Sequence, residues 1–257
     1  MGGILTTFAI TPSVGDHIVR KVFGLSIDVD TVWATGAAVV MVCALGLYLR
    51  RRLTNGVPGK LQTVWELGLT LVSDQVEGTI GPAGRAIVPL ALSLFVFILF
   101  CNFFEFVGIG SHFEWLPAPT GDINLPLAMA LFVIVLVHIY SLRARGLVGY
   151  VRHYIAGPFP IFLLPFNLFI NVLEEIAKPL TLTLRLFGNL LSGALMLSLI
   201  AYMGVQWKIG AIPVGNVLVI PVEAVWKSFS LFIGLIQAFI FALLTILYFD
   251  AAMSSEH

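Results

Sequence analysis

Long uncharged apolar runs alternate with charged segments along the whole chain. Runs without Asp, Glu, Lys or Arg cover residues 31–49, 86–104, 123–142, 186–207 and 228–249. Each holds about the 20 residues that an α-helix needs to cross the roughly 30 Å hydrocarbon core of a bilayer. The pattern therefore predicts an all-α, polytopic membrane protein with about five membrane-crossing helices and one integral membrane domain over residues 1–257.

A sixth run, residues 154–173, contains three prolines in its first twelve positions. Because proline breaks or kinks a helix, this run predicts a re-entrant or surface-lying start to a helix that continues to Arg185. We expect a long tilted hairpin over residues 160–207 and a last long span over residues 217–249.

The charged segment after the first run has helical amphipathicity over residues 59–77. One face of this helix carries its apolar positions, which are Leu61, Val64, Trp65, Gly68, Leu69 and Val72. Such a helix lies on the membrane surface or packs against the rest of the chain. Both arrangements stay open from the sequence.

Composition excludes an ordinary water-soluble enzyme. Apolar residues make up 59% of the chain and charged residues 11%, against about 25% charged residues in soluble domains. Fourteen basic and fourteen acidic residues cancel, so no net charge attracts nucleic acid. We expect no nucleic-acid partner, and any electrostatic function has to be local.

Basic residues alternate between the loops and predict the orientation of the chain. Residues 50–85 carry five Lys or Arg, residues 106–121 carry none, and residues 143–153 carry three. Since Lys and Arg accumulate on the cytoplasmic side, the N-terminus is expected outside and the C-terminus in the cytoplasm, provided that the 154–207 region crosses once. Arg20 and Lys21 weakly oppose this orientation.

No motif of catalysis, cofactor binding or metal binding is found. The histidines at 112, 153 and 257 lack metal-ligand spacing, and Cys43 and Cys101 lie inside apolar runs, where packing roles are expected. There is no phosphate loop, nucleophile elbow or HExxH motif. We expect no cofactor, no metal and no catalytic chemistry in this chain.

Arg185 is the ionisable group that most needs an explanation. It lies in an apolar segment with no carboxylate within one helical turn, and Glu174 and Glu175 are better placed to pair with Lys178. A charge inside a span costs about 2.5 to 3.5 kcal/mol on insertion scales, so such a residue indicates function. Its partner is either a carboxylate on another span or a group on another subunit.

Polar residues form a stripe on each of the two last helices. Asn189 and Ser192 follow Arg185 at helical spacing. In the last span the spacing of four, three, four and three aligns Glu223, Lys227, Ser230, Gly234 and Gln237. Two polar faces predict a wet or proton-conducting interior, although a salt bridge between Glu223 and Lys227 also accounts for those two residues.

Polar residues also gather where the second and third spans face the loop without basic residues. They are Asn102, Glu105, Thr120, Asp122 and Asn124. Such a mouth can admit cations and accept protons, but Asp122 or Thr120 can equally cap the third span. His138, near the inner end of that span, is expected to be a packing or interfacial residue rather than a proton relay.

Several motifs together resemble subunit a of the F-type, rotary ATP synthase membrane sector. The residues 184–189 (LRLFGN) and 237–241 (QAFIF) carry the resemblance. Further segments follow in the order expected for that family at residues 57–63, 89–92, 102–105, 120–124 and 178–180. The resemblance covers most of the chain.

The resemblance implies a stationary, non-catalytic proton-channel subunit in a bacterial plasma membrane. Its implied partners are a rotating ring of c subunits with buried carboxylates, the peripheral stalk b subunit, the peripheral ATPase sector and the lipid bilayer. Arg185 would face the ring and favour the ionised form of each passing carboxylate, separating two offset half-channels. By the same resemblance, Asn189 and Gln237 support the arginine, the outer half-channel is lined by Asn102, Glu105, Asp122 and Asn124, and the inner exit by Glu174 and Glu175.

One departure from the family pattern concerns the outer half-channel. Family members commonly place a Glu or His where this chain has Ala194 and Ser230. We expect Glu223, seven residues before Ser230 on the same face, or Glu105 to carry the proton instead, with water bridging the remainder. The alternative function is a stand-alone transporter or channel that binds an anion at Arg185.

Overall fold

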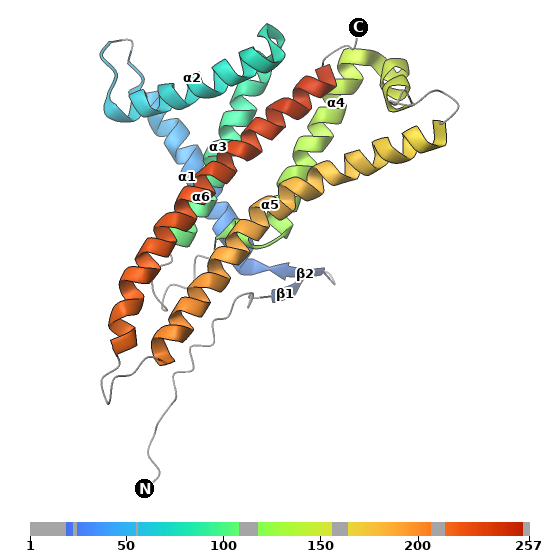
Figure 1. Ribbon diagram of the computed structural model, residues 1–257. Helices are drawn as coiled ribbons and strands as arrows, with labels where there is room; N and C mark the ends of the chain where they lie inside the picture. Colours follow the sequence, from blue (N-terminus) through green and yellow to red (C-terminus); the bar gives the residue numbers. More distant parts are fainter. Residues whose placement is uncertain are drawn as a thin grey trace.

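The computed structural model describes residues 19–22, 25–54, 56–107, 118–155, 164–206 and 214–253. Its elements are β1 (Val19–Val22), β2 (Leu25–Asp28), α1 (Val29–Arg52), α2 (Lys60–Ile80), η1 (Pro82–Ile87), α3 (Val88–Val107), η2 (Pro119–Gly121), α4 (Asn124–Ile155), α5 (Leu164–Gln206) and α6 (Val214–Met253) (Figure 1). Within these residues, α1, α3, α4, α5 and α6 are long and apolar enough to cross a membrane. The prediction of an all-α, polytopic membrane protein is confirmed.

The last two helices are far longer than a bilayer core is thick. α5 has 43 residues and α6 has 40, which corresponds to about 60 Å of helix at 1.5 Å per residue. They run side by side and diverge toward one end of the molecule, where α5 leans away from α6 (Figure 1). Residues 164–206 form one continuous helix, not the hairpin expected over 160–207, while residues 156–163 lie outside the described part.

α5 contains two prolines and stays helical through both. Pro179 lies in the interior and Pro165 in the first turn, where a missing N–H leaves no bond unmade. The Thr183 hydroxyl donates a hydrogen bond to the Pro179 carbonyl at 2.7 Å. The helix therefore continues through a proline that sequence rules treat as a breaker.

The apolar core lies where α3 meets α4, α5 and α6. Its fully buried side chains include Ile98, Val133, Leu186 and Phe249. In α3, 56% of the most apolar stretch is buried, against 17% in both α1 and α5. Cys101 on α3 is buried as expected, whereas Cys43 is exposed on α1 and does not pack in the core. α5 thus leaves much of its apolar surface uncovered.

α2 crosses one end of the bundle (Figure 1). Val72 and Val76 pack against Ala91 of α3 in a second cluster. Leu61 and Val64, which belong to the predicted apolar face, are exposed. The helix was predicted at nearly its observed position, but only part of that face is covered, because the buried stripe runs through Val72 and Val76 at helical spacing.

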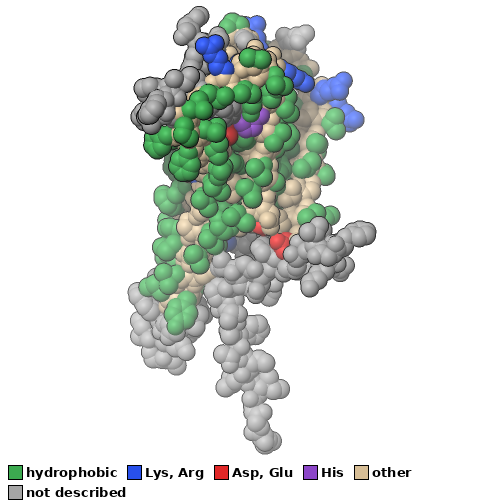
Figure 2. Space-filling model, turned by 90° about the vertical axis from the view of Figure 1, so that its right-hand side faces the viewer, with side chains coloured by type: hydrophobic (Ala, Val, Ile, Leu, Met, Phe, Trp, Pro, Cys, Tyr) green, Lys and Arg blue, Asp and Glu red, His purple; other side chains and the backbone are tan. Residues whose placement is uncertain are grey.

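The two ends of the bundle differ in charge. Figure 2 shows Lys and Arg gathered at one end, with hydrophobic side chains over most of the face between the ends. This basic end holds α2, the end of α1 with its three arginines, and the end of α6 (Figure 1). β1 and β2 form a short antiparallel pair before α1 that the sequence did not predict.

Candidate functional site

Arg185 lies on the exposed surface of α5. Its neighbour Leu184 is 56% exposed, whereas the next residue, Leu186, is buried in the core at 1%. Among the described residues, none forms an ion pair or hydrogen bond with the Arg185 side chain. The alternative in which a carboxylate on another span of this chain pairs with Arg185 is therefore not supported within the described structure.

Two amides lie on the packed α5 and α6 pair. Asn189, one turn after Arg185, and Gln237 on α6 are both half-buried. The Asn189 Nδ2 and Gln237 Oε1 atoms are buried and have no hydrogen-bond partner among the described residues. An unpaired buried polar atom costs about 1 to 3 kcal/mol, so each of these atoms can take a water or another polar group as its partner.

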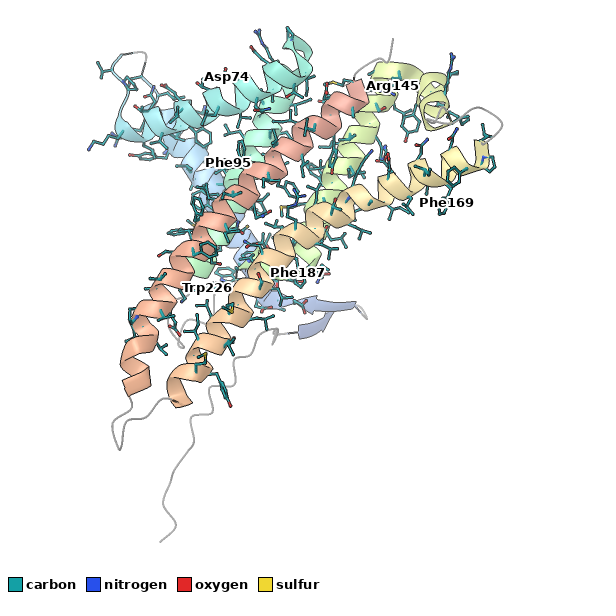
Figure 3. The ribbon with its side chains drawn as sticks, viewed as in Figure 1. Asp74, Phe95, Arg145, Phe169, Phe187 and Trp226 are labelled. Carbon is teal, nitrogen blue, oxygen red and sulfur yellow. The ribbon has the colours of Figure 1, made fainter. Side chains whose placement is uncertain are left out.

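Nearby, the two helices are joined by an indole hydrogen bond. The Trp226 Nε1–H of α6 donates to the Gly193 carbonyl of α5 at 3.2 Å. Figure 3 shows Trp226 and Phe187 on the part where the helices run together, and Phe169 on the part of α5 that leans away. The helices are therefore joined near Trp226, and the first part of α5, around Phe169, leans away from α6.

A buried polar cluster joins α3, η2 and α6. We call Asn102, Thr120 and Gly234 the α3–α6 cluster. The Asn102 Nδ2 donates to the Gly234 carbonyl at 2.9 Å, and the Thr120 hydroxyl donates to Asn102 Oδ1 at 2.9 Å. Asn102 is 1% exposed and Thr120 0%. Both functional ends of Asn102 are thus occupied by bonds that hold α3 and α6 together.

The other residues predicted for the outer mouth divide between local structure and outward positions. Asp122 is buried, and its Oδ1 accepts a hydrogen bond from the Asn124 backbone N–H at 3.0 Å, an Asx turn before α4. This bond supports the capping alternative for Asp122, while the Asn124 side chain is exposed. Glu105 lies in the last turn of α3, and its side chain lies outside the described part.

The polar stripe of α6 is partly buried. Ser230 is buried, and Glu223 and Lys227 are half-buried. Glu223 and Lys227 do not form an ion pair in the described part of α6, so the salt bridge considered for them is not observed. Glu223 remains available for another role. Ala194 on α5 is half-buried and carries no proton-binding group.

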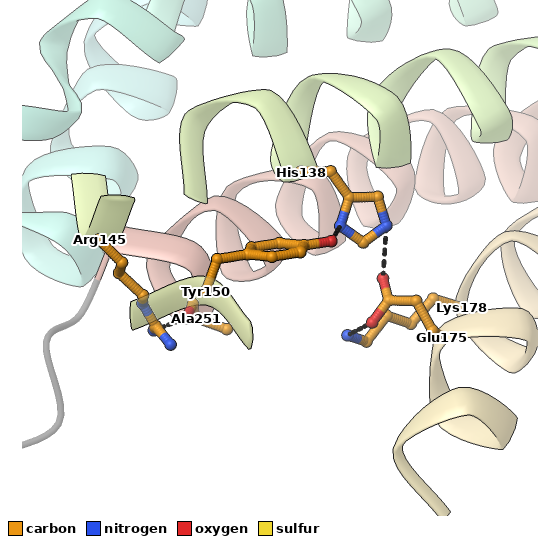
Figure 4. Close-up of polar contacts among 6 residues, drawn as sticks. All are labelled: His138, Arg145, Tyr150, Glu175, Lys178 and Ala251. Atoms are coloured by element: carbon orange, nitrogen blue, oxygen red, sulfur yellow. Dashed lines mark hydrogen bonds and ion pairs between the residues drawn. The ribbon is translucent and has the colours of Figure 1, made fainter. Parts of the chain in front are cut away.

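A second polar cluster joins α4 and α5 in the half of the bundle toward the basic end. We call His138, Tyr150, Glu175 and Lys178 the α4–α5 cluster. The Lys178 ammonium lies 2.9 Å from Glu175 Oε2, as the spacing predicted, and His138 Nε2 lies 3.3 Å from Glu175 Oε1 (Figure 4). The Tyr150 hydroxyl lies 3.2 Å from His138 Nδ1. Glu174, by contrast, is exposed.

This cluster gives the contacts of one residue from the sequence analysis and adds one residue. His138 was expected to be a packing or interfacial residue, and its Nδ1 lies 3.2 Å from the Tyr150 hydroxyl while its Nε2 lies 3.3 Å from Glu175 Oε1. Tyr150 was not predicted. The available signal was Gly146, whose positive φ of 68° turns the end of α4 away from a straight path. Among the described residues, no group of three or more His, Cys, Asp or Glu could hold a metal ion.

Comparison with known proteins gives one consistent family. Residues 31–250 match the family model described as ATP synthase A chain. The chain is 46% identical over 248 residues to ATP synthase subunit a of Acidothermus cellulolyticus, covering 96% of this chain and 85% of that protein. It is 41% identical over 253 residues to ATP synthase subunit a of Mycobacterium marinum, covering 95% and 94%. For the protein of that name from Psychrobacter arcticus, the identity is 33% over 259 residues, with 90% and 85% covered.

Proposed function

The chain belongs to the ATP synthase A chain family, and from that membership we propose that it is the stationary, proton-conducting and non-catalytic subunit of a rotary ATP synthase. It is a multi-pass membrane protein of the ATP synthase membrane sector. In the proposed mechanism, protons cross the membrane through two offset half-channels. Each proton rides part of the way on a carboxylate of a rotating ring of c subunits, and this movement drives ATP synthesis.

The unpaired Arg185 is the observation that carries the proposal. It lies exposed on α5 without an acidic partner among the described residues, and an unpaired charge at membrane depth is costly. A carboxylate arriving from a neighbouring ring removes this cost. Because the arginine favours the ionised carboxylate, a ring carboxylate has to release its proton before it passes.

Polar residues toward the two ends of the bundle are the proposed lining of two separate half-channels. The outer one is proposed at the end opposite the basic end, with Asn102, Glu105, Asp122, Asn124 and Ser230 as its lining and Glu223 or Glu105 as the proton carrier. The inner one is proposed beside Glu174 and Glu175. Arg185 lies about 15 Å beyond Glu175 along α5 at 1.5 Å per residue, and Asn189 and Gln237 meet the ring near it. This spacing supports a charge barrier between two aqueous paths.

The basic end supports an orientation and a set of partners. Lys and Arg accumulate on the cytoplasmic side of bacterial membrane proteins, so we place the basic end and the C-terminus in the cytoplasm and the N-terminus outside. The proposed location is the bacterial plasma membrane. The uncovered faces of α5 and α6 are assigned to the c ring, and the b subunit and the peripheral ATPase sector complete the complex.

The proposal is tested by Arg185→Ala in the assembled complex in membrane vesicles. Removing one partner of a buried charge pair costs about 3 to 5 kcal/mol, so ATP-driven proton pumping should fall more than about 100-fold. Passive proton leak should rise because the barrier between the half-channels is lost. Arg143→Ala, an exposed arginine at the basic end, is the matched control and should pump normally.

Two measurements make the outcome decisive. Retention of the c ring and the ATPase sector in the purified complex shows that assembly is intact. Coupled pumping that persists in assembled Arg185→Ala complexes would contradict the proposal and leave the arginine with a structural role. A chain that moves an anion in vesicles without any other subunit would instead support a stand-alone transporter.

A further inference from the structure

His138 is held between two polar groups from different segments of the chain. Nε2 faces Glu175 Oε1 of α5 at 3.3 Å, and Nδ1 faces the Tyr150 hydroxyl at 3.2 Å. The exposed fractions of the His138 and Glu175 side chains are 27% and 18%. His138 thus lies between a carboxylate of α5 and a hydroxyl of the last part of α4 (Figure 4).

A break in α4 brings Tyr150 to His138. Twelve residues separate the two, which is about 18 Å along a straight helix and too far for a contact. At Gly146 the backbone takes φ 68° and ψ 172°, so the last part of α4 turns back. The Arg145 Nη2 donates to the Ala251 carbonyl of α6 at 2.8 Å and ties this turn to the end of α6 (Figure 4).

The groups around His138 come from three helices. From α5 come Glu175 and Lys178, and from the last part of α4 comes Tyr150. On α6, the Tyr248 ring lies 6.0 Å from the Lys178 ammonium, and Asp250 precedes Ala251. Imidazole is the side chain of this set that can accept a proton at one nitrogen and release one from the other.

We propose that His138 is a proton-relay residue of the inner half-channel, passing protons between Glu175 and the Tyr150 hydroxyl. The inference rests on the proposed function, because a relay requires a proton path along this side of α5. It assigns to the relay a histidine of α4, in addition to the carboxylates of α5. Lys178 has a positioning role, since its ammonium holds the Glu175 carboxylate from the side opposite His138.

The transfer balances with the groups in place. When Nδ1 carries the imidazole proton, a proton that reaches the Glu175 carboxylate moves to Nε2 and leaves an imidazolium. The imidazolium passes its Nδ1 proton to the Tyr150 oxygen as that hydroxyl releases its own proton to water at the basic end. Exchange of the neutral imidazole back to the Nδ1–H tautomer restores the starting state, with one proton moved. Hydrolysis-driven pumping runs the same steps in reverse.

The test uses His138→Gln and Tyr150→Phe in the assembled complex in vesicles. Glutamine keeps hydrogen-bonding ends but carries no exchangeable charge, and phenylalanine keeps the ring without the hydroxyl. Removing a positioned proton-transfer group slows enzymes by roughly 10²- to 10⁴-fold, and water can partly replace the relay, so we expect proton flux to fall about tenfold in His138→Gln. Ser141→Ala, a buried polar residue one turn along α4, is the matched control.

The pH profile and chemical rescue separate a relay from a packing role. Flux in His138→Gln should depend on cytoplasmic-side pH differently from wild-type flux, and imidazole added to His138→Ala vesicles should restore part of the flux. Wild-type flux with a wild-type pH profile in assembled His138→Gln complexes would overturn the relay. If His138→Gln does not assemble, Tyr150→Phe decides, and an unchanged flux and pH profile in that variant overturns the proposal.

Together with the Arg185 experiment, these results distinguish failure of the relay from failure of the proposed function. Loss of coupling in Arg185→Ala together with normal flux in both α4 variants would disprove the relay and leave the proposed function standing. Coupled pumping that persists in Arg185→Ala would disprove the proposed function and the relay that rests on it.

Discussion

The α3–α6 cluster and the α4–α5 cluster both join helices through polar side chains, yet they differ in charge and in burial. The first consists of an amide, a hydroxyl and a backbone carbonyl, and Asn102 and Thr120 are almost completely buried. The second contains a carboxylate, an ammonium and an imidazole, with side chains 18% to 33% exposed. Neutral, almost completely buried groups thus join α3 and α6, and partly exposed titratable groups join α4 and α5.

The difference predicts that the first cluster stabilises the fold and that the second carries the proposed proton relay. A buried neutral network with every partner present stabilises a packed structure, and it becomes costly when one partner is removed. A partly exposed ion pair contributes about 0 to 1 kcal/mol. Substitutions in the two clusters should therefore have opposite effects on stability and on flux.

The largest loss of stability is expected for Asn102→Leu. Leucine removes both hydrogen bonds and leaves the Thr120 hydroxyl buried without a partner, which costs about 1 to 3 kcal/mol. Heating the purified complex in nanodiscs while labelling Cys101, a buried neighbour on α3, reports the opening of this region by mass spectrometry. Asn124→Ala, whose side chain is exposed, is the control. Equal labelling in both variants would show that the α3–α6 cluster does not stabilise the bundle.

A smaller loss is expected for Gly234→Ala. A Cβ at this position would lie 3.1 Å from Asn102 Nδ2 and 3.2 Å from Asn102 Cβ, so Asn102 has to shift. Overpacking typically costs about 1 to 3 kcal/mol, and the low end applies where a side chain can move. The same Cys101 labelling measures it. A Cβ at Gly36 on α1 would meet nothing within 4 Å, so Gly36→Ala should not raise the labelling. A rise in Gly36→Ala would show that any glycine substitution in a helix raises the labelling, and that overpacking against Asn102 is not the cause.

The smallest change in stability is expected for Glu175→Gln. The amide keeps an oxygen acceptor for its neighbours and loses only the charge, which is worth about 1 kcal/mol or less for a partly exposed pair. Cys101 labelling should stay close to wild type while proton flux falls. Glu174→Gln, at an exposed position, controls for charge at this level of α5 and should reduce flux less. A stability loss in Glu175→Gln larger than in Asn102→Leu would reverse the comparison.

Much of the fold could be predicted from runs of apolar residues. The spans expected at 31–49, 86–104 and 123–142 lie within or overlap α1, α3 and α4, because helix length in a membrane follows from bilayer thickness. The prolines of the 154–173 run suggested a re-entrant start and a hairpin over 160–207, whereas residues 164–206 form one helix. The pairing of β1 with β2 could not be predicted, since strands of only four residues are too short to show a clear sequence pattern.

Some features of the candidate site could likewise be predicted from the sequence, and others could not. Arg185 stands out from the sequence alone, because a charge in an apolar segment without a nearby carboxylate is visible without coordinates. The pairing of Glu175 with Lys178 also follows from helical spacing. Capping by Asp122 could be stated only as an alternative, because a local turn and a channel lining use the same residue types.

By itself, the sequence determined the membrane-spanning architecture, the amphipathic helix and the exceptional position of Arg185. Each of these depends on the composition and periodicity of a continuous stretch of chain. Only the tertiary structure decided that Asn102 contacts Gly234, 132 residues later, and that His138 lies between Tyr150 and Glu175. Those contacts depend on how separate helices pack and on one turn at Gly146. The periodicity within one helix shows which of its faces is apolar, but not which face of another helix that face will contact.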